Sequence, residues 1–315
     1  MNALPAKPMR DVLIEALYDR MVADEKIFFL SSDMGAPALD RIRADIKDRF
    51  INVGIAEQNL INVAAGLAME GFTVYTYAIA SFYFRAYEQI RINLALPSQL
   101  REMNVNMLAL GAGFSYDVSG PTHHCLDDIS AMRTMPNVMT ISPCDWNAAL
   151  ALADYAPTTP RPKYFRLDGK PLPAIYPGPE AINFVKGFTE LCTGRDVCFV
   201  AVGVMVHQAL KIVSRYEGSV GVIDVFMLDN CNEDELASSL SHYSTVITLE
   251  EGYINRGGLE SLVANLITER GLNCRLKRFG VPNKFELSLG DRYMLHEANK
   301  MNEYHITRAL EAALI

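Results

Sequence analysis

Two runs of alternating strand-like and helix-like segments constrain the fold of this 315-residue chain more than any other feature. In the first run, short apolar segments predict strands at residues 26–30, 73–77, 105–110, 138–141 and 163–166. Helical apolar spacing predicts helices at residues 9–21, 58–69, 82–94, 126–133 and 146–155, the last capped by Asp145. Strands that alternate with helices indicate a mostly parallel sheet covered on both faces.

A Pro- and Gly-rich segment, GKPLPAIYPG at residues 169–178, separates this run from a second one. The second run predicts strands at residues 197–202, 221–225, 245–249 and 275–279, and helices at 206–214, 233–240 and 258–269. We therefore expect an α/β chain of two doubly wound domains, residues 1–168 and 186–315, joined by a linker at residues 169–185. Length and a hydrophobic content of 50% are sufficient for two such cores.

Charge and cysteine usage exclude several classes of protein. The formal net charge of -8 and the lack of a Lys/Arg cluster argue against binding to nucleic acid or to an anionic membrane. The six cysteines show no CxxC spacing, which favours reduced thiols over a disulfide framework or a zinc site. The N-terminus lacks the apolar core of a signal peptide, and no uncharged apolar stretch reaches membrane-spanning length. We expect a cytoplasmic protein.

The segment FINVGIAEQNLINVAAGLAMEG, residues 50–71, places Glu57 just before a helix that is apolar almost all round. By position alone, this carboxylate is a helix cap or a partner of the helix dipole. The helix behind it, however, must be buried in a core or against another subunit. Four small residues would let a second helix approach closely: Ala64, Ala65, Gly66 and Ala68. Glu57 is therefore expected near an interface and partly out of water, where a carboxylate suits proton exchange with a ring nitrogen.

Four segments, in the same order along the chain, resemble the transketolase family of thiamine-diphosphate enzymes. They are GIAEQNLINVAAGLAMEG (54–71), SFYFRAYEQI (81–90), GPTHHCLDDISAMRTMPNVMTISPCD (120–145) and TLEEGYINRGGLESLV (248–263). The first segment is also similar to 1-deoxyxylulose-5-phosphate synthase. The resemblance covers nearly the whole chain and implies a pyrimidine-binding domain followed by a transketolase C-terminal domain.

The resemblance gives Glu57 a catalytic role. In this family the matching glutamate shares a proton with N1′ of the aminopyrimidine, which leads to deprotonation of thiazolium C2. Phe82 stands where the family places an aromatic ring against the aminopyrimidine, although in isolation it reads as a core residue. Arg85 matches the arginine of the deoxyxylulose-phosphate synthase version and is expected beside the cofactor.

The same comparison implies a set of substrate-facing residues. His123, in GPTH, matches the histidine that takes part in proton transfer with the substrate, and His124 stands where the family usually has Gln. Arg166 lies where transketolases hold the substrate phosphate, with a surface arginine at a strand end as the equal alternative. Ser119 replaces an aspartate that recognises a donor hydroxyl in transketolases, so we expect an unusual donor or acceptor. Asp117 could substitute for that missing aspartate only if the loop shifts. Adjacent residues seldom bind one metal ion, so HHC at 123–125 is not interpreted as a metal site.

The chain lacks the GDG…N motif that holds the metal and diphosphate of the cofactor in such enzymes. We therefore expect the smaller, C-terminal subunit of a split transketolase that transfers a two-carbon ketol unit between sugars or sugar phosphates. An N-terminal partner subunit would carry GDG…N and hold Mg²⁺ or Ca²⁺, in a heterotetramer with two copies of each chain. Three alternatives remain: the beta subunit of a 2-oxoacid dehydrogenase, a deoxyxylulose-phosphate synthase and a non-catalytic paralogue.

Overall fold

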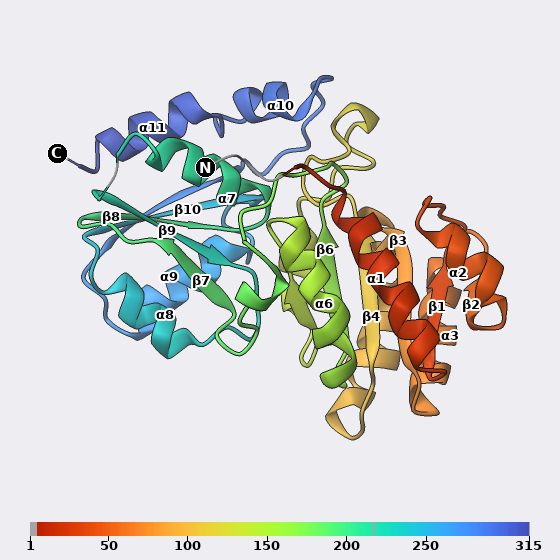
Figure 1. Ribbon diagram of the computed structural model, residues 1–315. Coiled ribbons are helices and arrows are strands. Elements are labelled where there is room, and N and C mark those ends of the chain that lie inside the picture. The colour runs from red at the N-terminus through yellow and green to blue at the C-terminus, as the bar shows by residue number, and fades with distance from the viewer. Residues whose placement is uncertain (1–4, 217, 315) are drawn as a thin grey trace.

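The computed structural model describes residues 5–216 and 218–314, which form two α/β domains side by side (Figure 1). Each domain is built around one sheet with helices on both faces, so the predicted fold class is confirmed. The predicted domain boundaries stay a prediction. Contacts run across both of them: Lys7 pairs with Leu172, and the Tyr176 hydroxyl donates to Asp224 at 2.8 Å.

The first sheet has six parallel strands in the order β2-β1-β3-β4-β6-β5. Their bounds are β1 Ile27–Ser31, β2 Phe50–Asn52, β3 Thr73–Ile79, β4 Val105–Leu110, β5 Met139–Ile141 and β6 Lys163–Leu167. All six residues of β4 are buried, as expected for a strand covered on both faces. The connection after β1 runs to β2 on one side, and the connection after the adjacent β3 runs to β4 on the other side. The carboxyl ends of β1 and β3 therefore form a topological switch point.

Helices cover the two faces of the first sheet with separate apolar cores. One face carries α1 Met9–Ala23, α2 Leu39–Asp45 and α6 Trp146–Thr158, with α1 and α6 in front of the sheet in Figure 1. The other face carries α3 Glu57–Met69, α5 Asp128–Arg133 and the irregular segment after β3.

The second sheet has five strands in the order β11-β10-β8-β9-β7, with β7 antiparallel to β9. The strands are β7 Phe188–Cys192, β8 Val197–Ala201, β9 Val220–Val225, β10 Thr245–Tyr253 and β11 Arg275–Val281. One face packs on α7 Val204–Val213, α10 Arg292–Ala298 and α11 Glu303–Glu311. The other packs on α8 Glu233–Leu240 and α9 Leu259–Glu269. Sequence analysis missed α2, β2, β7, α10 and α11, and the helix predicted from residue 126 begins at Asp128.

The helix predicted at residues 82–94 is wrong as a continuous α-helix. The chain forms a 3₁₀ helix, η2 Ala80–Ala86, then the short α4 Tyr87–Gln89 and a π-helix, η3 Ile90–Ala95. Four further 3₁₀ turns are η1 Lys47–Arg49, η4 Pro97–Gln99, η5 Asp117–Ser119 and η6 Pro179–Ala181. Because 3₁₀ geometry places residues i and i+3 directly above one another, it aligns the side chains of Phe82 and Arg85.

Three of the four small residues of α3 pack inside the chain's own core, which also holds residues of the helical segment after β3. Ala64, Ala65 and Ala68 are buried against the chain's own sheet, in the core that contains Leu60 and Ile61. Of the four, only Gly66 is exposed. The exposed residues of α3 are Gln58, Asn59, Asn62, Gly66 and Met69. The Asn62 side chain accepts a hydrogen bond from Asn93 of η3 at 2.8 Å.

Edge strand β5 joins the two domains through backbone hydrogen bonds. Ser142 N donates to Phe226 O at 2.9 Å, and Leu228 N donates to Thr140 O at 2.9 Å. Arg133 of α5 adds hydrogen bonds to the carbonyl oxygens of Leu228 and of residues 257 and 258. The domains are therefore joined by backbone pairing and side chains as well as by the connecting segment.

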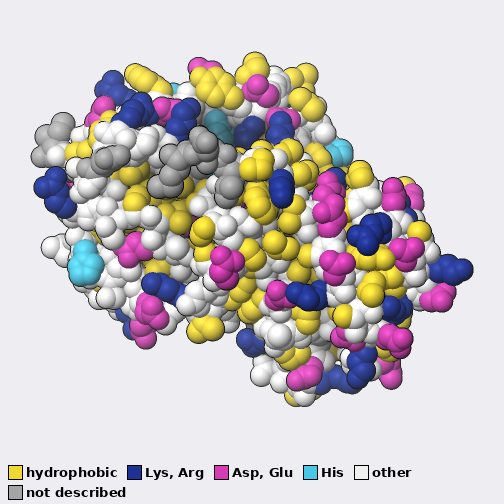
Figure 2. Space-filling model, in the orientation of Figure 1, with side chains coloured by type: hydrophobic (Ala, Val, Ile, Leu, Met, Phe, Trp, Pro, Cys, Tyr) yellow, Lys and Arg dark blue, Asp and Glu magenta, His cyan; other side chains and the backbone are white. Residues whose placement is uncertain are grey.

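On the face drawn in Figure 2, acidic and basic side chains are interspersed over the first domain, around α1 and α2. Hydrophobic side chains gather near α10, where five exposed ones are Phe285, Leu287, Leu289, Tyr293 and Met294. Each helix in the described part of the chain is too short or too polar to cross a bilayer.

Candidate active site

The predicted cofactor and substrate residues follow the carboxyl ends of neighbouring parallel strands. Glu57 comes after β2, Phe82 and Arg85 come after β3, and His123 lies on the loop after β4. Carboxyl ends of parallel strands meet at one edge of the sheet, which is where α/β folds bind ligands. The topology therefore brings residues from three distant segments to one edge.

Glu57 is the first residue of α3 and is only 3% exposed. Its Oε1 accepts a hydrogen bond from Arg85 Nη1 at 3.0 Å, and within the described residues its Oε2 accepts none. The N-cap is Ala56, so the carboxylate is not a side-chain cap, although its charge is favoured at the positive end of the helix dipole. Glu57 therefore presents a buried carboxylate oxygen that remains available to a ligand.

Phe82 and Arg85 stack on one another along η2. The guanidinium carbon of Arg85 lies 4.4 Å from the centre of the Phe82 ring, a cation–π arrangement. Phe82 is half-buried and Arg85 is exposed, with 54% of its side chain accessible. Because Arg85 also reaches Glu57, the carboxylate, the guanidinium and the aromatic ring form one continuous group.

His123 extends this group through its contact with Phe82. The ring centres of His123 and Phe82 are 5.5 Å apart, and His123 Nδ1 lies 3.0 Å from Thr122 Oγ1. The half-buried His123 also meets Tyr116 edge-on at 6.2 Å. Tyr116 is a candidate substrate contact that sequence analysis missed. Its ring covers Gly111, where a Cβ would overlap the ring, so the glycine at this position was the available signal.

His124 and Ser119 lie on the same loop but face other surroundings. His124 is 7% exposed, donates from Nε2 to Asp117 O at 3.2 Å and packs edge-on against Phe114. Ser119 is exposed at the loop's outer turn. The structure thus brings His123, but not His124, to the Phe82 ring.

Arg166 lies in the interior, 3% exposed. Its Nε donates to both carboxylate oxygens of Asp128, at 2.8 and 3.0 Å, and its Nη2 donates to Cys125 O and Glu251 O. Burial opposes its charge, but Asp128 outweighs this effect and the pKa of Arg166 is raised. This arrangement makes Arg166 a link between β6, α5 and the C-terminal domain, away from solvent.

Sequence analysis missed a buried charged cluster between the domains. Glu251 Oε1 accepts from His296 Nε2 at 2.5 Å and lies 3.1 Å from Arg292 Nε, while Arg292 Nη2 donates to Asp168 at 2.7 Å. Asp117 accepts from Lys170 Nζ and from Arg292 N, so it is turned towards the C-terminal domain and does not replace the missing substrate carboxylate. The only sign of this cluster in the sequence was a pair of acidic residues, Glu250 and Glu251, within an apolar strand.

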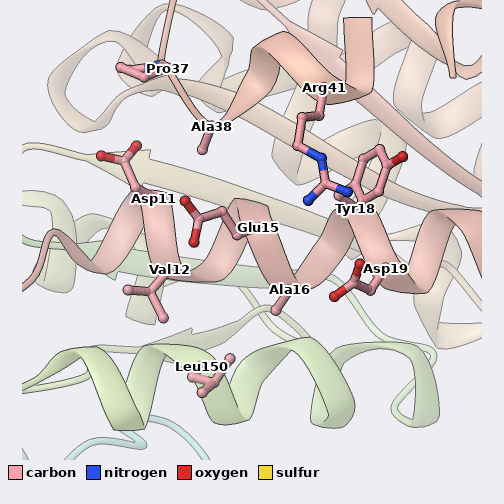
Figure 3. A pocket seen from close by; sticks show the side chains of 10 residues that line it. All are labelled: Asp11, Val12, Glu15, Ala16, Tyr18, Asp19, Pro37, Ala38, Arg41 and Leu150. Atoms are coloured by element: carbon pink, nitrogen blue, oxygen red, sulfur yellow. The ribbon is translucent and has the colours of Figure 1, made fainter. Parts of the chain in front are cut away.

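A groove of about 590 Å³ lies apart from these residues, between α1, α6 and the start of α2 (Figure 3). Figure 3 shows Asp11 and Glu15 on α1, with Arg41 beside Tyr18. Arg41 covers the Tyr18 ring at 3.8 Å, and Asp11 pairs with Arg10. The groove is on the opposite face of the first sheet from α3, and none of its lining residues belongs to the candidate site.

Comparisons with known families cover both domains of this fold. The family model described as "Transketolase, pyrimidine binding domain" matches residues 6–173. The chain belongs to the transketolase family. A second model, "Transketolase, C-terminal domain", matches residues 188–306. The predicted family is confirmed, as is the similarity to 1-deoxy-D-xylulose-5-phosphate synthases.

Several transketolase relatives are similar over most of their length. One of the subunits of an apulose-4-phosphate transketolase, from Actinobacillus succinogenes, is 36% identical, over 79% of each chain. A 6-deoxy-6-sulfo-D-fructose transketolase subunit of a Clostridium species is 30% identical, over 90% of this chain and 88% of the relative. The solved structure of a split gene transketolase, an inactive β4 tetramer, superposes with a TM-score of 0.84 at 28% identity, covering 98% of this chain and 99% of that one.

Membership of the transketolase family implies dependence on thiamine diphosphate. The residues present fit the aminopyrimidine end of this cofactor. Glu57 offers a buried acceptor oxygen to a ring nitrogen, and Phe82 offers an aromatic face within the same group. The site thus offers a hydrogen-bond acceptor and an aromatic surface, which the aminopyrimidine half of the cofactor requires.

Proposed function

We propose that this chain is the smaller subunit of a split, thiamine-diphosphate-dependent transketolase that transfers a two-carbon ketol unit between sugar or sugar-phosphate substrates. The observation that carries this proposal is the continuous group Glu57–Arg85–Phe82–His123 at one edge of the first sheet. The near-complete mutual coverage with a split gene transketolase supports the division into subunits.

Glu57 would hold a proton at N1′ of the aminopyrimidine, through the carboxylate oxygen that Arg85 leaves free. When bound, thiamine diphosphate supplies a nucleophilic carbon and an electron sink. Phe82 would orient the aminopyrimidine ring by contact with its face, and Arg85 would balance the Glu57 charge while remaining accessible. A buried carboxylate suits this task because it exchanges a proton with a neighbouring base more readily than a hydrated one does.

His123 would exchange protons with a substrate oxygen, because its ring is half-buried and lies next to Phe82. Ser119, on the exposed turn of the same loop, would contact the outer part of the substrate. The buried His124 would act through the shape of the loop, since its Nε2 holds Asp117 O. Arg166 would not contact the substrate, because its Nε and Nη2 already donate hydrogen bonds inside the protein.

A partner subunit with a GDG…N motif would complete the site by holding the diphosphate and its Mg²⁺ or Ca²⁺. Its docking surface on this chain would be the outer face of α3 and the adjoining η3, next to Glu57. This surface includes exposed apolar residues: Met69, Ile92 and Leu96. By analogy with split enzymes of the family, two copies of each chain would form the heterotetramer.

The relatives' names suggest donors to test. Apulose 4-phosphate and 6-deoxy-6-sulfo-D-fructose are the substrates in the names of two similar subunits. Both are modified sugars, in agreement with Ser119 standing where transketolases carry an aspartate.

Calorimetric titration of thiamine diphosphate into the reconstituted two-subunit complex, followed by assays with both donors, tests the proposal. Glu57→Gln is expected to lower turnover by about 100-fold or more, because it removes the proton exchange. Glu233→Gln is the matched control: Glu233 is also the first residue of a helix, but it is exposed and lies in the other domain. Equal cofactor binding and equal turnover in wild type and Glu57→Gln would rule out the catalytic role.

A further inference from the structure

We infer that Glu251, in the C-terminal domain, is a positioning residue that holds the loop carrying His123 in place. The inference rests on the proposed function for the role of His123, whereas the hold on the loop is a separate, measurable property. Glu251 lies on β10, far from His123 in the chain, and acts through the loop's base.

The loop, residues 114–124, is closed at its base by two backbone hydrogen bonds. Gly113 N donates to Cys125 O and Cys125 N donates to Gly113 O, both at 2.9 Å. The chain between them carries Tyr116, Ser119 and His123. A displacement of this base would therefore move all three together.

Glu251 contacts this base directly. Its Oε2 accepts a hydrogen bond from Phe114 N at 2.8 Å, and a Cβ placed on Gly113 would collide with the same oxygen. The carboxylate is 2% exposed, so water does not compete for the Phe114 amide. A charge-assisted hydrogen bond without competing water is among the stronger contacts available to a loop.

The rest of the cluster keeps Glu251 charged and oriented. Burial alone would raise the pKa of Glu251, but Arg292 and His296 outweigh it and lower this pKa to about 2. Arg292 also donates from its backbone N to Asp117 within the loop, at 2.8 Å. Phe114 packs edge-on against both His124 and His296, with ring centres 5.0 and 6.2 Å away. The C-terminal domain thus holds the loop at Phe114 and at Asp117.

Hydrogen–deuterium exchange on the full chain tests the hold without requiring a substrate. In Glu251→Ala, amides of residues 114–124 are expected to exchange about tenfold faster or more. Glu251→Gln keeps an acceptor for Phe114 N, so its exchange rate should fall between those of Glu251→Ala and wild type. It carries the test if Glu251→Ala does not fold.

Glu250→Gln is the control: Glu250 is equally buried but accepts from Leu259 N and Glu260 N at the start of α9. It should speed exchange there and leave the loop unchanged. Unchanged loop exchange in both Glu251 variants would overturn the inference.

Kinetics of the reconstituted enzyme test the effect on His123. Glu251→Ala is expected to lower kcat by about 10- to 100-fold, because a displacement near 1 Å suffices for such a loss. Thiamine diphosphate affinity should stay within about threefold, since Glu57 and Phe82 do not touch Glu251. Faster loop exchange with unchanged kcat would overturn the positioning role. A wild-type complex that neither binds the cofactor nor turns over a donor would instead refute the proposed function, and the exchange result would still decide the hold on the loop.

Discussion

Arg85 and Glu57 form an ion pair with very unequal exposure: the arginine side chain is 54% accessible and the glutamate side chain 4%. A buried carboxylate needs a partner, and here the partner is a cation that can still move in solvent. The stacking of Arg85 on Phe82 at 4.4 Å limits that movement. Glu57 is therefore stabilised by a group that can adjust when a ligand enters beside it.

Arg85→Ala is expected to lower the turnover of the reconstituted enzyme by about tenfold, because Glu57 loses its partner and Phe82 loses its stacked cation. Arg85→Lys should recover only part of the loss, since an ammonium cannot both stack and donate as a guanidinium does. The measurement is kcat at saturating thiamine diphosphate. The control is Arg270→Ala, because Arg270 is also an exposed arginine that pairs with a carboxylate, Asp234, but it lies in the other domain. Full activity in Arg85→Ala would contradict the role given to this pair.

Arg166→Met is expected to lower the free energy of unfolding by about 3–5 kcal/mol, because it leaves Asp128 buried without its cation. Urea denaturation of the full chain measures this loss. Replacing the pair together, as Arg166→Met with Asp128→Leu, should restore much of the stability. If Arg166→Met folded with unchanged stability but showed a raised KM for a phosphorylated donor, Arg166 would instead be the substrate ligand that the family resemblance suggests.

The order of strands and helices was predictable because its signals are local. Apolar runs such as β4 and the helical spacing of α1 are written in neighbouring residues. The geometry of the segment after β3 was not predictable, because its apolar residues follow helical spacing while the chain forms 3₁₀ and π turns there. Strands as short as β2 and a helix as polar as α11 offer little local signal.

Within the candidate site, four positions were predictable only from the family resemblance, and the contacts among them required the fold. The ion pair of Glu57 with Arg85 joins two segments that meet because β2 and β3 flank β1. For Arg166, the sequence predicted the position near the end of a strand correctly. It did not predict that Asp128 and two backbone carbonyl groups would enclose the side chain. No local pattern reveals such partners, and the pairing of Glu251 with Arg292 was missed for the same reason.

Gly113→Ala is expected to destabilise the chain more than Gly271→Ala does. Both glycines have similar left-handed φ angles, +57° and +62°, so the backbone strain on substitution is alike. Only at Gly113 does the new methyl group meet another group, the Glu251 carboxylate. We expect a difference of about 1–3 kcal/mol in the free energy of unfolding from this overpacking. Equal losses in urea denaturation would show that the contact between Gly113 and Glu251 is looser than described.

The stability of the chain should depend on pH through Asp224. Burial raises the pKa of this carboxyl to about 7, against hydrogen bonds from Cys144 and Tyr176 that lower it. Between the ordinary value of 3.8 and about 7, the native state therefore holds a proton that the unfolded chain releases. The contribution of Asp224 to the free energy of unfolding thus falls as pH rises through this window.

Asp224→Asn cannot release that proton and keeps an acceptor for the Tyr176 hydroxyl. Its stability relative to wild type should rise between pH 4 and pH 8, by up to about 4 kcal/mol. Urea denaturation at the two pH values measures the difference, and other titrating groups cancel in the comparison. A constant difference across this range would show that Asp224 is ionised in the native state throughout.

Gly66→Leu separates the stability of the chain from its assembly. Gly66 is exposed on the outer face of α3, and a Cβ built there meets nothing within 4 Å. The substitution should therefore stabilise the isolated chain by about 0.5–1 kcal/mol, because Gly is a poor helix former. If the partner subunit docks on this face, the same side chain would prevent close approach and weaken the complex by about tenfold or more. Thermal denaturation and analytical ultracentrifugation measure the two effects. Ser238→Leu, at an exposed position of α8 in the other domain, is the control for added bulk. A more stable chain that still assembles with wild-type affinity would place the partner elsewhere, whereas a less stable chain would mean that the α3 helix is strained at this position.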